Sequence, residues 1–350
     1  MKILHIMHLE KFIPPFIKFI NENFNPNDHI FVIKGKPRSD YGMDLNINNV
    51  FWLDEELKIV EFKEYLYKAK KIILHGLWFD EALGLLATQP WLLKKSYWIM
   101  WGGDFYFPEI QSDLRKYIIK NIRNVITYLP KQIDYIREHY GAKGKYIECL
   151  FYPDGAYNIE LIEKIKKEAC VSDKGNKLRI QIGNSATITN RHENVFKYIK
   201  NYIDRSGLDV NKLEFIVPLS YGDELYKERI IQIGKEMFSN SFIPLTSFMR
   251  YEDYLKLLLT IDIAIFYHNR QQGLGNIIQL LGMGKKVYIT KDTPQWDLFT
   301  SLGVKVYDLE NEFNFEIDNE ALIKNQEVIK KHFSLERIKK DWGNIINEEK

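Results

Sequence analysis

Short runs of apolar, β-branched residues alternate with helix-length amphipathic stretches along almost the whole chain, and no other feature constrains the fold as strongly. This alternation is typical of α/β proteins with parallel sheets. Helices are predicted between the runs, for example over Glu55–Ala69 and Pro130–Tyr140, and the tail from Asn319 also has a helical pattern. We predict strands at Lys2–Met7, His29–Ile33, Val50–Leu53, Lys71–Leu74, Tyr97–Trp101, Val125–Tyr128, Tyr146–Cys149, Leu178–Ile182, Leu213–Val217, Phe242–Leu245, Ile261–Phe266, Lys286–Ile289 and Val304–Tyr307.

The alternating series is interrupted once, between residues 151 and 177. The turn sequence Tyr152–Gly155 opens this segment, a charged stretch follows, and Ser172–Asn176 closes it. Such composition indicates a domain boundary. We therefore predict one doubly wound, Rossmann-like domain over residues 1–150, a linker over 151–177 and a second such domain over 178–330. Two such domains imply a cleft between them, with ligands at the carboxyl ends of strands.

The overall composition is that of a soluble globular protein of 350 residues. Lys and Arg number 49 and Asp and Glu 47, a net charge of +2, which argues against nucleic acid as the main partner. Cys149 and Cys170 are too few for a disulfide framework or a four-ligand zinc site, so a reducing cytosol is the simplest interpretation. No apolar run approaches the ~20 residues that span a bilayer, and polar residues interrupt the first segment, which makes a poor signal peptide.

Two polar turns follow predicted strands of the second domain. Gly183-Asn184-Ser185 follows Leu178–Ile182, where glycine admits a ligand to the backbone and the polar side chains can donate to phosphate. A capped strand-to-helix turn explains this turn equally well. The second turn leads into an apolar helix, and the N-terminus of such a helix is a site for a diphosphate. Alternatively, the glycines of this turn only allow the helix to pack closely on the sheet. Its polar and glycine residues run from His268 through Arg270, Gln271, Gln272, Gly273 and Gly275 to Asn276.

Two segments of the first domain carry candidate proton-transfer groups. Asp104 follows two glycines at a strand end, beneath Trp101 and aromatic neighbours, where a raised pKa would suit a general base. A cap of the next turn is the alternative interpretation of Asp104. His75 also ends a predicted strand, although a lone histidine is more often structural. The histidines are scattered without a metal-binding spacing, so no metal site is predicted.

These motifs resemble one family. Several segments look like those of the TDP-N-acetylfucosamine:lipid II N-acetylfucosaminyltransferases. They are His75-Gly76, Trp98-x-x-Trp101-Gly102-x-Asp104-x-Tyr106, Gly183-Asn184-Ser185 with Asn190–Glu193, Val217-Pro218-x-x-Tyr221, Arg270-Gln271-Gln272-Gly273-x-Gly275 and Trp296. This is the 4-alpha-L-fucosyltransferase family, glycosyltransferase family 56. The resemblance covers about residues 70–300 and implies a GT-B fold, with residues 331–350 as a helix that packs back on the first domain.

The resemblance also implies a reaction. It is the inverting, metal-independent transfer of a 4-acetamido-4,6-dideoxyhexose from a dTDP-sugar to an undecaprenyl-diphosphate-linked glycan in cell-surface polysaccharide synthesis, without a cofactor. The first domain would bind the acceptor, through His8, Trp101 and Tyr106, with Asp104 and His75 as catalytic candidates. The second would bind the donor, through Gly183, Asn184, Ser185, Pro218, Tyr221, Arg270, Gln271, Gln272, Gly273, Gly275 and Asn276.

A lipid-linked acceptor implies peripheral contact with the inner face of the cytoplasmic membrane. The apolar stretch Phe12–Ile20 suits an interfacial helix, although a buried first helix is the preferred interpretation. The basic helices Leu114–Arg123 and Lys131–Arg137 could meet anionic headgroups. Three alternatives stay open: another nucleotide sugar or a non-lipid acceptor, a sugar-binding protein, and an NAD-dependent sugar-modifying enzyme. The absence of an N-terminal GxGxxG counts against the last of these.

Overall fold

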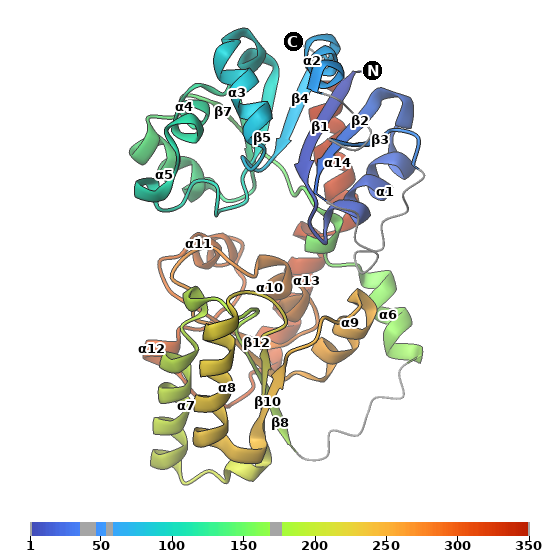
Figure 1. Cartoon of the computed structure of the whole chain (residues 1–350). Coiled ribbons are helices and arrows are strands. Elements are labelled where there is room, and N and C mark those ends of the chain that lie inside the picture. The colour runs from blue at the N-terminus through green and yellow to red at the C-terminus, as the bar shows by residue number, and fades with distance from the viewer. Residues whose placement is uncertain (1, 36–46, 54–58, 169–176, 349–350) are drawn as a thin grey trace. The chain divides into compact units, whose positions relative to one another are not determined.

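The computed structural model describes residues 2–35, 47–53, 59–168 and 177–348 (Figure 1). Its contacts divide the chain into two compact units. Unit 1 comprises Met1–Asp154 together with Leu335–Lys350, and unit 2 comprises Gly155–Ser334. The boundary lies inside the segment that the sequence analysis assigns to a linker, and helix α6 (Ile159–Glu168) of that segment belongs to unit 2. Residues 169–176 of the predicted linker lie outside the described residues.

Unit 1 contains one sheet in which every neighbouring pair of strands is parallel. Its strands are β1 (Ile3–His8), β2 (His29–Lys34), β3 (Val50–Trp52), β4 (Lys71–His75), β5 (Ser96–Ile99), β6 (Asn124–Thr127) and β7 (Lys145–Glu148). Their order is β3-β2-β1-β4-β5-β6-β7, so the chain starts in the middle of the sheet and winds outward in both directions. All seven strands predicted for the first half of the sequence are confirmed, with ends that differ by one or two residues.

Helices cover both faces of the unit 1 sheet (Figure 1). They are α1 (Ile13–Asn23), α2 (Ile59–Lys68), α3 (Asp80–Thr88), α4 (Asp113–Asn121), α5 (Pro130–Tyr140) and α14 (Leu335–Asn347). The alternation of β1 shows which face each helix covers. Leu4 and Ile6 join the apolar cluster beneath α2, α3, α4 and α5, whereas the ring of His5 contacts Phe16 of α1 and Trp342 of α14. Residues 54–58 of the predicted helix Glu55–Ala69 lie outside the described residues.

Helix α1 contains most of the apolar stretch Phe12–Ile20, for which a buried helix and an interfacial helix were the two interpretations. Its side chains Ile13, Phe16, Ile17 and Ile20 are all buried in unit 1. The buried first helix is therefore confirmed as the interpretation of this stretch, because the apolar face that an interfacial helix would place in lipid is already packed.

Unit 2 contains a second parallel sheet, with the strand order β10-β9-β8-β11-β12. Its strands are β8 (Leu178–Ile182), β9 (Leu213–Pro218), β10 (Phe242–Leu245), β11 (Ile263–Phe266) and β12 (Lys286–Ile289). The strand predicted at Val304–Tyr307 is wrong. Only Tyr307 pairs there, in an isolated bridge to Tyr288, because the backbone N–H of Val304 instead donates to Phe299 and closes the preceding helix.

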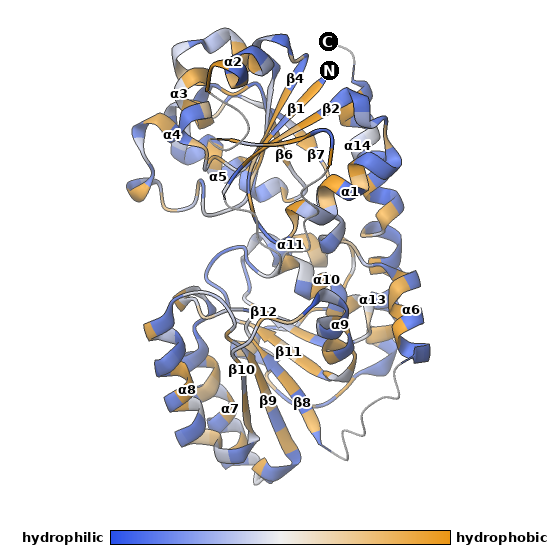
Figure 2. Ribbon diagram, turned by 45° about the vertical axis from the view of Figure 1, so that its right-hand side comes forward, coloured by the Kyte–Doolittle hydropathy of each residue, from blue (hydrophilic) through white to orange (hydrophobic). Residues whose placement is uncertain are grey.

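Several helices of unit 2 begin at a side-chain cap. They are α6, α7 (His192–Ser206), α8 (Glu224–Phe238), α9 (Tyr251–Thr260), α10 (Leu274–Gly282), α11 (Pro294–Ser301), α12 (Leu309–Glu312) and α13 (Asn319–His332). The Asp223 carboxylate accepts from the backbone N–H of Tyr226 at the start of α8, and Asp318 accepts from Ala321 at the start of α13. Figure 2 shows the resulting pattern, with mostly apolar strands and helices that carry one apolar stripe.

Candidate functional site

The two polar turns of unit 2 meet at the carboxyl end of its sheet. Strands β8 and β11 are hydrogen-bonded neighbours, so the loops that follow them lie side by side. The side chain of Gln272, after β11, donates from Nε2 to Asn184 Oδ1 at 3.2 Å, Ser185 Oγ at 3.2 Å and Thr187 Oγ1 at 3.0 Å. Its Oε1 accepts from the Thr189 hydroxyl at 2.6 Å. One amide thus joins both loops.

Asn190 holds this network from below and is completely buried. Its Oδ1 accepts from the backbone N–H of Asn184 at 3.0 Å. Its Nδ2 donates to the backbone carbonyl of Ser185 at 3.0 Å and to the hydroxyl of Thr187 at 2.8 Å. Because backbone groups occupy both ends of the amide, the loop after β8 has a fixed conformation before any ligand binds.

Glycine is required at two points of this site. Gly183 has φ +68°, and a Cβ there would lie 2.6 Å from both Asn190 Oδ1 and His192 Nε2. Gly273 has φ +67°, and a Cβ there would lie 3.2 Å from Cε1 of His268. Both residues occupy the left-handed region that other L-residues rarely adopt. The glycines therefore allow the two loops to pack closely around the Gln272 amide.

The N-terminus of α10 opens at the same place. Gly273 caps the helix without a side-chain hydrogen bond, so the first N–H groups of the helix have no partner within it. Two guanidinium groups add positive charge near this turn. Arg270 donates to the carbonyl of Gln271, and Arg191 stacks 3.7 Å from the ring centre of Tyr267 and donates to its carbonyl. This arrangement suits an anionic ligand.

The structure brings the predicted donor residues together at this edge of the sheet. Asn184 Nδ2 donates to the hydroxyl of Tyr221 at 2.8 Å, which ties in the loop after β9. Pro218 is the buried last residue of β9. The remaining predicted residues follow β11 in the loop or the first turn of α10, namely Arg270, Gln271, Gln272, Gly273, Gly275 and Asn276.

Asp104 lies beneath aromatic residues, as the sequence predicted, but its carboxylate is fully enclosed. Its side chain is 0 % exposed, and three N–H groups donate to the carboxylate. Oδ2 accepts from the Leu77 backbone at 3.1 Å and Trp98 Nε1 at 2.8 Å, and Oδ1 accepts from the Trp101 backbone at 3.1 Å. Burial raises the pKa of this carboxyl, and the three donors oppose the shift. The geometry gives Asp104 a positioning role, and its role as base stays a prediction.

Asp104 fixes a segment that the sequence analysis did not single out. Leu77 donates its N–H to Asp104 and accepts from Arg115 Nε at 2.9 Å through its carbonyl. The next residue, Trp78, is 36 % exposed, and the Arg115 guanidinium lies 4.9 Å from the centre of its ring. The segment therefore presents an ordered indole at the surface. No spacing in the sequence indicates this, since Arg115 is 37 positions away from Trp78.

His75 belongs to a row of buried histidines. Its Nδ1 lies 2.8 Å from the hydroxyl of Tyr152, and its Nε2 lies 3.0 Å from Nδ1 of His5, whose Nε2 lies 3.0 Å from Nδ1 of His29. Trp101 Nε1 can only donate, and it donates to the Tyr152 hydroxyl at 2.9 Å. The hydroxyl proton is then free to face His75, so all three rings can point their N–H groups in one direction.

The two contacts between the rings suit neutral imidazoles, because one nitrogen of each facing pair must donate and the other must accept. At the end of the row, Nε2 of His29 has no hydrogen-bond partner among the described residues. Burial lowers the pKa of His75 to about 3 and the pKa of His29 to about 4, and it lowers the pKa of His5 well below its ordinary value. His75 is 1 % exposed. Its predicted catalytic role stays a prediction.

The predicted acceptor residues of unit 1 are spread over different environments. His8 is exposed at the end of β1, and Trp101 is partly exposed after β5. Tyr106 is 8 % exposed, and its hydroxyl accepts from Gln132 Nε2 at 3.5 Å. His8 and Trp101 are therefore open to a ligand, whereas Tyr106 presents little surface to one.

A partly exposed carboxyl at the same end of unit 1 was missed by the sequence analysis. Asp154 lies two residues after Tyr152, in a short turn that the sequence analysis interpreted only as part of the domain boundary. Burial raises the pKa of Asp154 to about 7, and the nearby charge of Lys11 opposes this shift. A carboxyl with a pKa near neutrality suits a general base.

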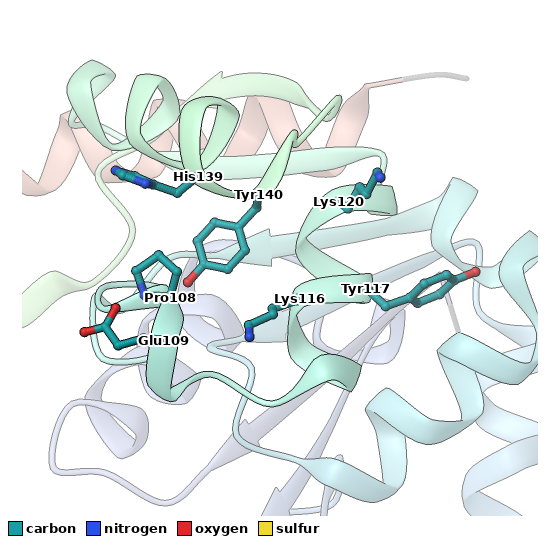
Figure 3. Close-up of a pocket in the computed structure, with 7 residues that line it drawn as sticks. All are labelled: Pro108, Glu109, Lys116, Tyr117, Lys120, His139 and Tyr140. Atoms are coloured by element: carbon teal, nitrogen blue, oxygen red, sulfur yellow. The ribbon is translucent and has the colours of Figure 1, made fainter.

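Unit 1 also contains a shallow hollow of about 510 Å³ (Figure 3). Lys116 and Lys120 project from α4 on one side, and His139 and Tyr140 come from α5. Exposed apolar side chains stand near it in the sequence: Ile110 is 75 % exposed and Phe107 is 42 % exposed. The lining of the hollow itself combines the two lysines with Pro108, Tyr117 and Tyr140.

In the part of the chain that the structure describes, no three or more His, Cys, Asp and Glu side chains are grouped so that they could hold a metal ion. Likewise, none of the described helices combines the length and the apolar character that crossing a membrane requires.

Solved structures with a similar fold include a UDP complex and two glycosyltransferases. HepE of Anabaena, solved with UDP and glucose, is 12% identical over 99% of both chains, with a TM-score of 0.69. A glycosyltransferase of Rickettsia africae ESF-5 is 12% identical over 99% of this chain and 98% of its own, with a TM-score of 0.67. WaaG, a glycosyltransferase of lipopolysaccharide biosynthesis, is 8% identical over 99% and 100%, with a TM-score of 0.59. Two parallel-sheet units of this kind define the GT-B fold.

The sequence identifies the family within that class. The family model described as 4-alpha-L-fucosyltransferase, glycosyl transferase group 56, matches residues 58–348. The chain belongs to this family and is a glycosyltransferase, as the motifs in both halves of the sequence predicted.

Proposed function

We propose that this glycosyltransferase moves a 4-acetamido-4,6-dideoxyhexose from a dTDP-linked donor to a glycan on undecaprenyl diphosphate, with inversion and without a metal or cofactor. The observation that carries the proposal is the Gln272 network, which joins two loops at the open N-terminus of α10. Membership of a 4-alpha-L-fucosyltransferase family supports a deoxyhexose, since fucose is a 6-deoxyhexose. The UDP bound to HepE supports a nucleotide donor.

The transfer needs charge stabilisation on the leaving group. The acceptor hydroxyl oxygen forms a bond to the anomeric carbon while the bond from that carbon to the diphosphate breaks. The electron pair of the broken bond leaves with dTDP, and the hydroxyl proton passes to a base. In unit 2, the first N–H groups of α10, which have no partner within the helix, would stabilise the departing diphosphate, with Arg191 and Arg270 as further cations.

Asp154 is the base that unit 1 supports best. Asp104 and His75 are buried and their polar atoms are hydrogen-bonded, so neither can reach an acceptor hydroxyl without leaving its partners. Asp154 is partly exposed, and its pKa of about 7 suits proton abstraction near neutral pH. The exposed His8 and the partly exposed Trp101 lie on the same unit and would contact the acceptor glycan.

The donor nucleotide is tested by a thermal-shift panel of dTDP, UDP, GDP and ADP. We expect dTDP alone to raise the melting temperature, because a ligand at 100 times its dissociation constant stabilises the folded state by about 2.7 kcal/mol. A response to UDP or a purine nucleotide, and none to dTDP, would contradict the proposed donor. A flat response to all four would contradict the donor site itself.

A lipid-linked acceptor requires the enzyme to work at a membrane surface. We assign the contact to the face around the hollow of Figure 3, where Lys116 and Lys120 lie beside Glu109 and Tyr117. The exposed Ile110 and the half-exposed Tyr117 offer apolar contact with the headgroup region. Lysines near an anionic leaflet contribute about 1 kcal/mol each to binding.

Vesicle flotation tests this surface directly. The double substitution Lys116→Glu and Lys120→Glu is expected to reduce binding to vesicles containing phosphatidylglycerol at least tenfold at low salt, because each lysine accounts for about 1 kcal/mol of attraction. The matched control reverses two exposed lysines of unit 2, Lys197 and Lys235, and should leave flotation unchanged. Equal binding of the wild type and the α4 variant would remove this surface from the proposal.

A further inference from the structure

The ring of His268 faces an oxygen acceptor at each of its two nitrogens. His268 follows β11 and is 0 % exposed. Its Nε2 lies 2.8 Å from Oδ1 of Asn190. Its Nδ1 lies 3.1 Å from the backbone carbonyl oxygen of Gln272. A carbonyl oxygen can only accept, so the contact with Gln272 calls for a proton on Nδ1.

The orientation of the Asn190 amide is fixed independently of His268. Its Oδ1 accepts from the backbone N–H of Asn184, and its Nδ2 lies 3.0 Å from the backbone carbonyl of Ser185. Turning the amide over would set its NH₂ group against an N–H and its oxygen against a carbonyl. The contact between Asn190 and His268 therefore calls for a proton on Nε2 as well.

Only an imidazolium satisfies both contacts. A neutral ring carries one proton, which leaves a nitrogen lone pair directed at either the Asn190 oxygen or the Gln272 oxygen. The shorter contact is that with Asn190, at 2.8 Å against 3.1 Å. In a neutral ring the contact with Gln272 is therefore the one that lacks its proton.

The surroundings keep the ring neutral in the free protein. Burial, His192 at the start of α7, Arg270 in the same loop and Arg191 beside α7 all lower the pKa of His268, and the Gln272 carbonyl opposes them. The resulting pKa is about 3. His192 is itself buried, and its Nε2 has no hydrogen-bond partner among the described residues. What is missing around His268 is a negative charge.

A bound diphosphate would supply that charge. A Cβ at Gly273 would lie 3.2 Å from Cε1 of His268, so the ring lies directly against the residue that caps α10. An anion held by the first N–H groups of α10 lies next to the same residue. A neighbouring negative charge favours the charged form of a histidine.

We propose that His268 takes up one proton when the diphosphate of the nucleotide sugar binds at the N-terminus of α10. The proton on Nδ1 then donates to the Gln272 carbonyl and fixes the turn between Gln272 and Gly273. The proton is released when the nucleotide leaves. His268 is thus a positioning residue that couples donor binding to protonation, and this inference rests on the proposed donor site.

Calorimetry with dTDP-glucose tests the proton uptake. The diphosphate of this probe is a diester and does not titrate near neutral pH, so any proton exchanged belongs to the protein. We expect the binding heat to depend on the ionisation enthalpy of the buffer, with uptake of about one proton per ligand. The affinity should fall about tenfold for each unit by which the pH rises, over the range in which the free ring is neutral and the bound ring is charged.

Two substitutions identify the group that takes up the proton. His268→Gln should bind dTDP-glucose without proton uptake, because an amide does not titrate. His192→Gln removes the neighbouring buried histidine and should keep the proton uptake. No acceptor among the described residues contacts Nε2 of His192, so nothing there stabilises a second proton on that ring. If His268→Gln fails to bind, the buffer and pH series on the wild type still decides whether a proton is taken up.

The possible results separate this inference from the proposed function. If neither dTDP-glucose nor dTDP binds, the donor site is wrong and the inference falls with it. If the probe binds with no proton uptake and with an affinity that is independent of pH, the donor site stands and the inference is overturned. Uptake that persists in His268→Gln also overturns it, because another group then carries the proton.

Discussion

Asp104→Asn is expected to destabilise unit 1 by about 3 kcal/mol, since leaving buried donors unsatisfied around a lost charge has a cost of this order. The carboxylate accepts from Leu77, Trp98 and Trp101. An asparagine keeps one acceptor oxygen, and its NH₂ group must face at least one of these N–H groups. Urea unfolding followed by circular dichroism measures the loss, and activity should fall in parallel with the folded fraction.

Asp154→Asn is the matched control, because it makes the same change at a carboxyl of the same unit. The pKa of Asp154 is raised to about 7 in the folded state, above the value of about 4 in an unfolded chain. The cost of its charge to the folded state therefore builds up between about pH 4 and pH 7 and is fully present above pH 7. Removing that charge should leave stability equal or slightly higher. The loss of a general base should lower turnover by about 10²–10⁴-fold.

The two variants together assign the base. A stable but inactive Asp104→Asn would return the role of base to Asp104 and contradict the structural role described above. An Asp154→Asn enzyme with full turnover would contradict the role proposed for Asp154. The donor affinity should be unchanged in both folded variants, because these residues lie in unit 1 and the proposed donor residues lie in unit 2.

Gln272→Glu is expected to weaken dTDP binding by about 100-fold or more, since like charges placed together cost several kcal/mol. A carboxylate oxygen would replace the Nε2 group that donates to Asn184, Ser185 and Thr187. The serine and threonine hydroxyls can turn to donate to it, but the Asn184 oxygen cannot. The added charge would also repel the diphosphate. Calorimetric titration with dTDP measures the affinity.

Asn269→Asp is the control for this charge change. Asn269 is exposed in the same loop, so the substitution adds the same negative charge without breaking the network. We expect a loss of affinity of no more than a fewfold, because exposed charges are screened. Equal losses in the two variants would show that charge alone, and not the Gln272 amide, governs binding.

Much of the fold could be predicted because it depends on local pattern. Buried parallel strands read as short continuous apolar runs, and this signal located all the strands of both sheets. It failed at Val304–Tyr307, where Val304, Val306 and Tyr307 are apolar and buried but only Tyr307 pairs. Burial without pairing has the same sequence signature as a strand, so pattern alone could not separate the two.

The site was only partly predictable, because its key contacts join distant segments. The Gly183 and Gly273 turns were found from their composition, and β8 and β11 place them together. The buried carboxylate of Asp104 accepts from the backbone N–H of Leu77, 27 positions away, and from the indole N–H of Trp98. Likewise, the row of His5, His29 and His75 exists only because β2, β1 and β4 are adjacent in the sheet. None of these contacts can be predicted from the local sequence pattern.

The contribution of α14 to unit 1 has a consequence for biosynthesis. Trp342 is completely buried there, and its indole N–H donates to the carbonyl of Phe151. Lys71, at the start of β4, donates to the carbonyl of Ile346 near the end of α14. A nascent chain that has emerged only as far as β7 therefore lacks helix α14, which covers part of one face of the unit 1 sheet. Unit 2 is continuous in sequence, so the ribosome delivers it whole before unit 1 can close, the reverse of the usual order in which domains mature.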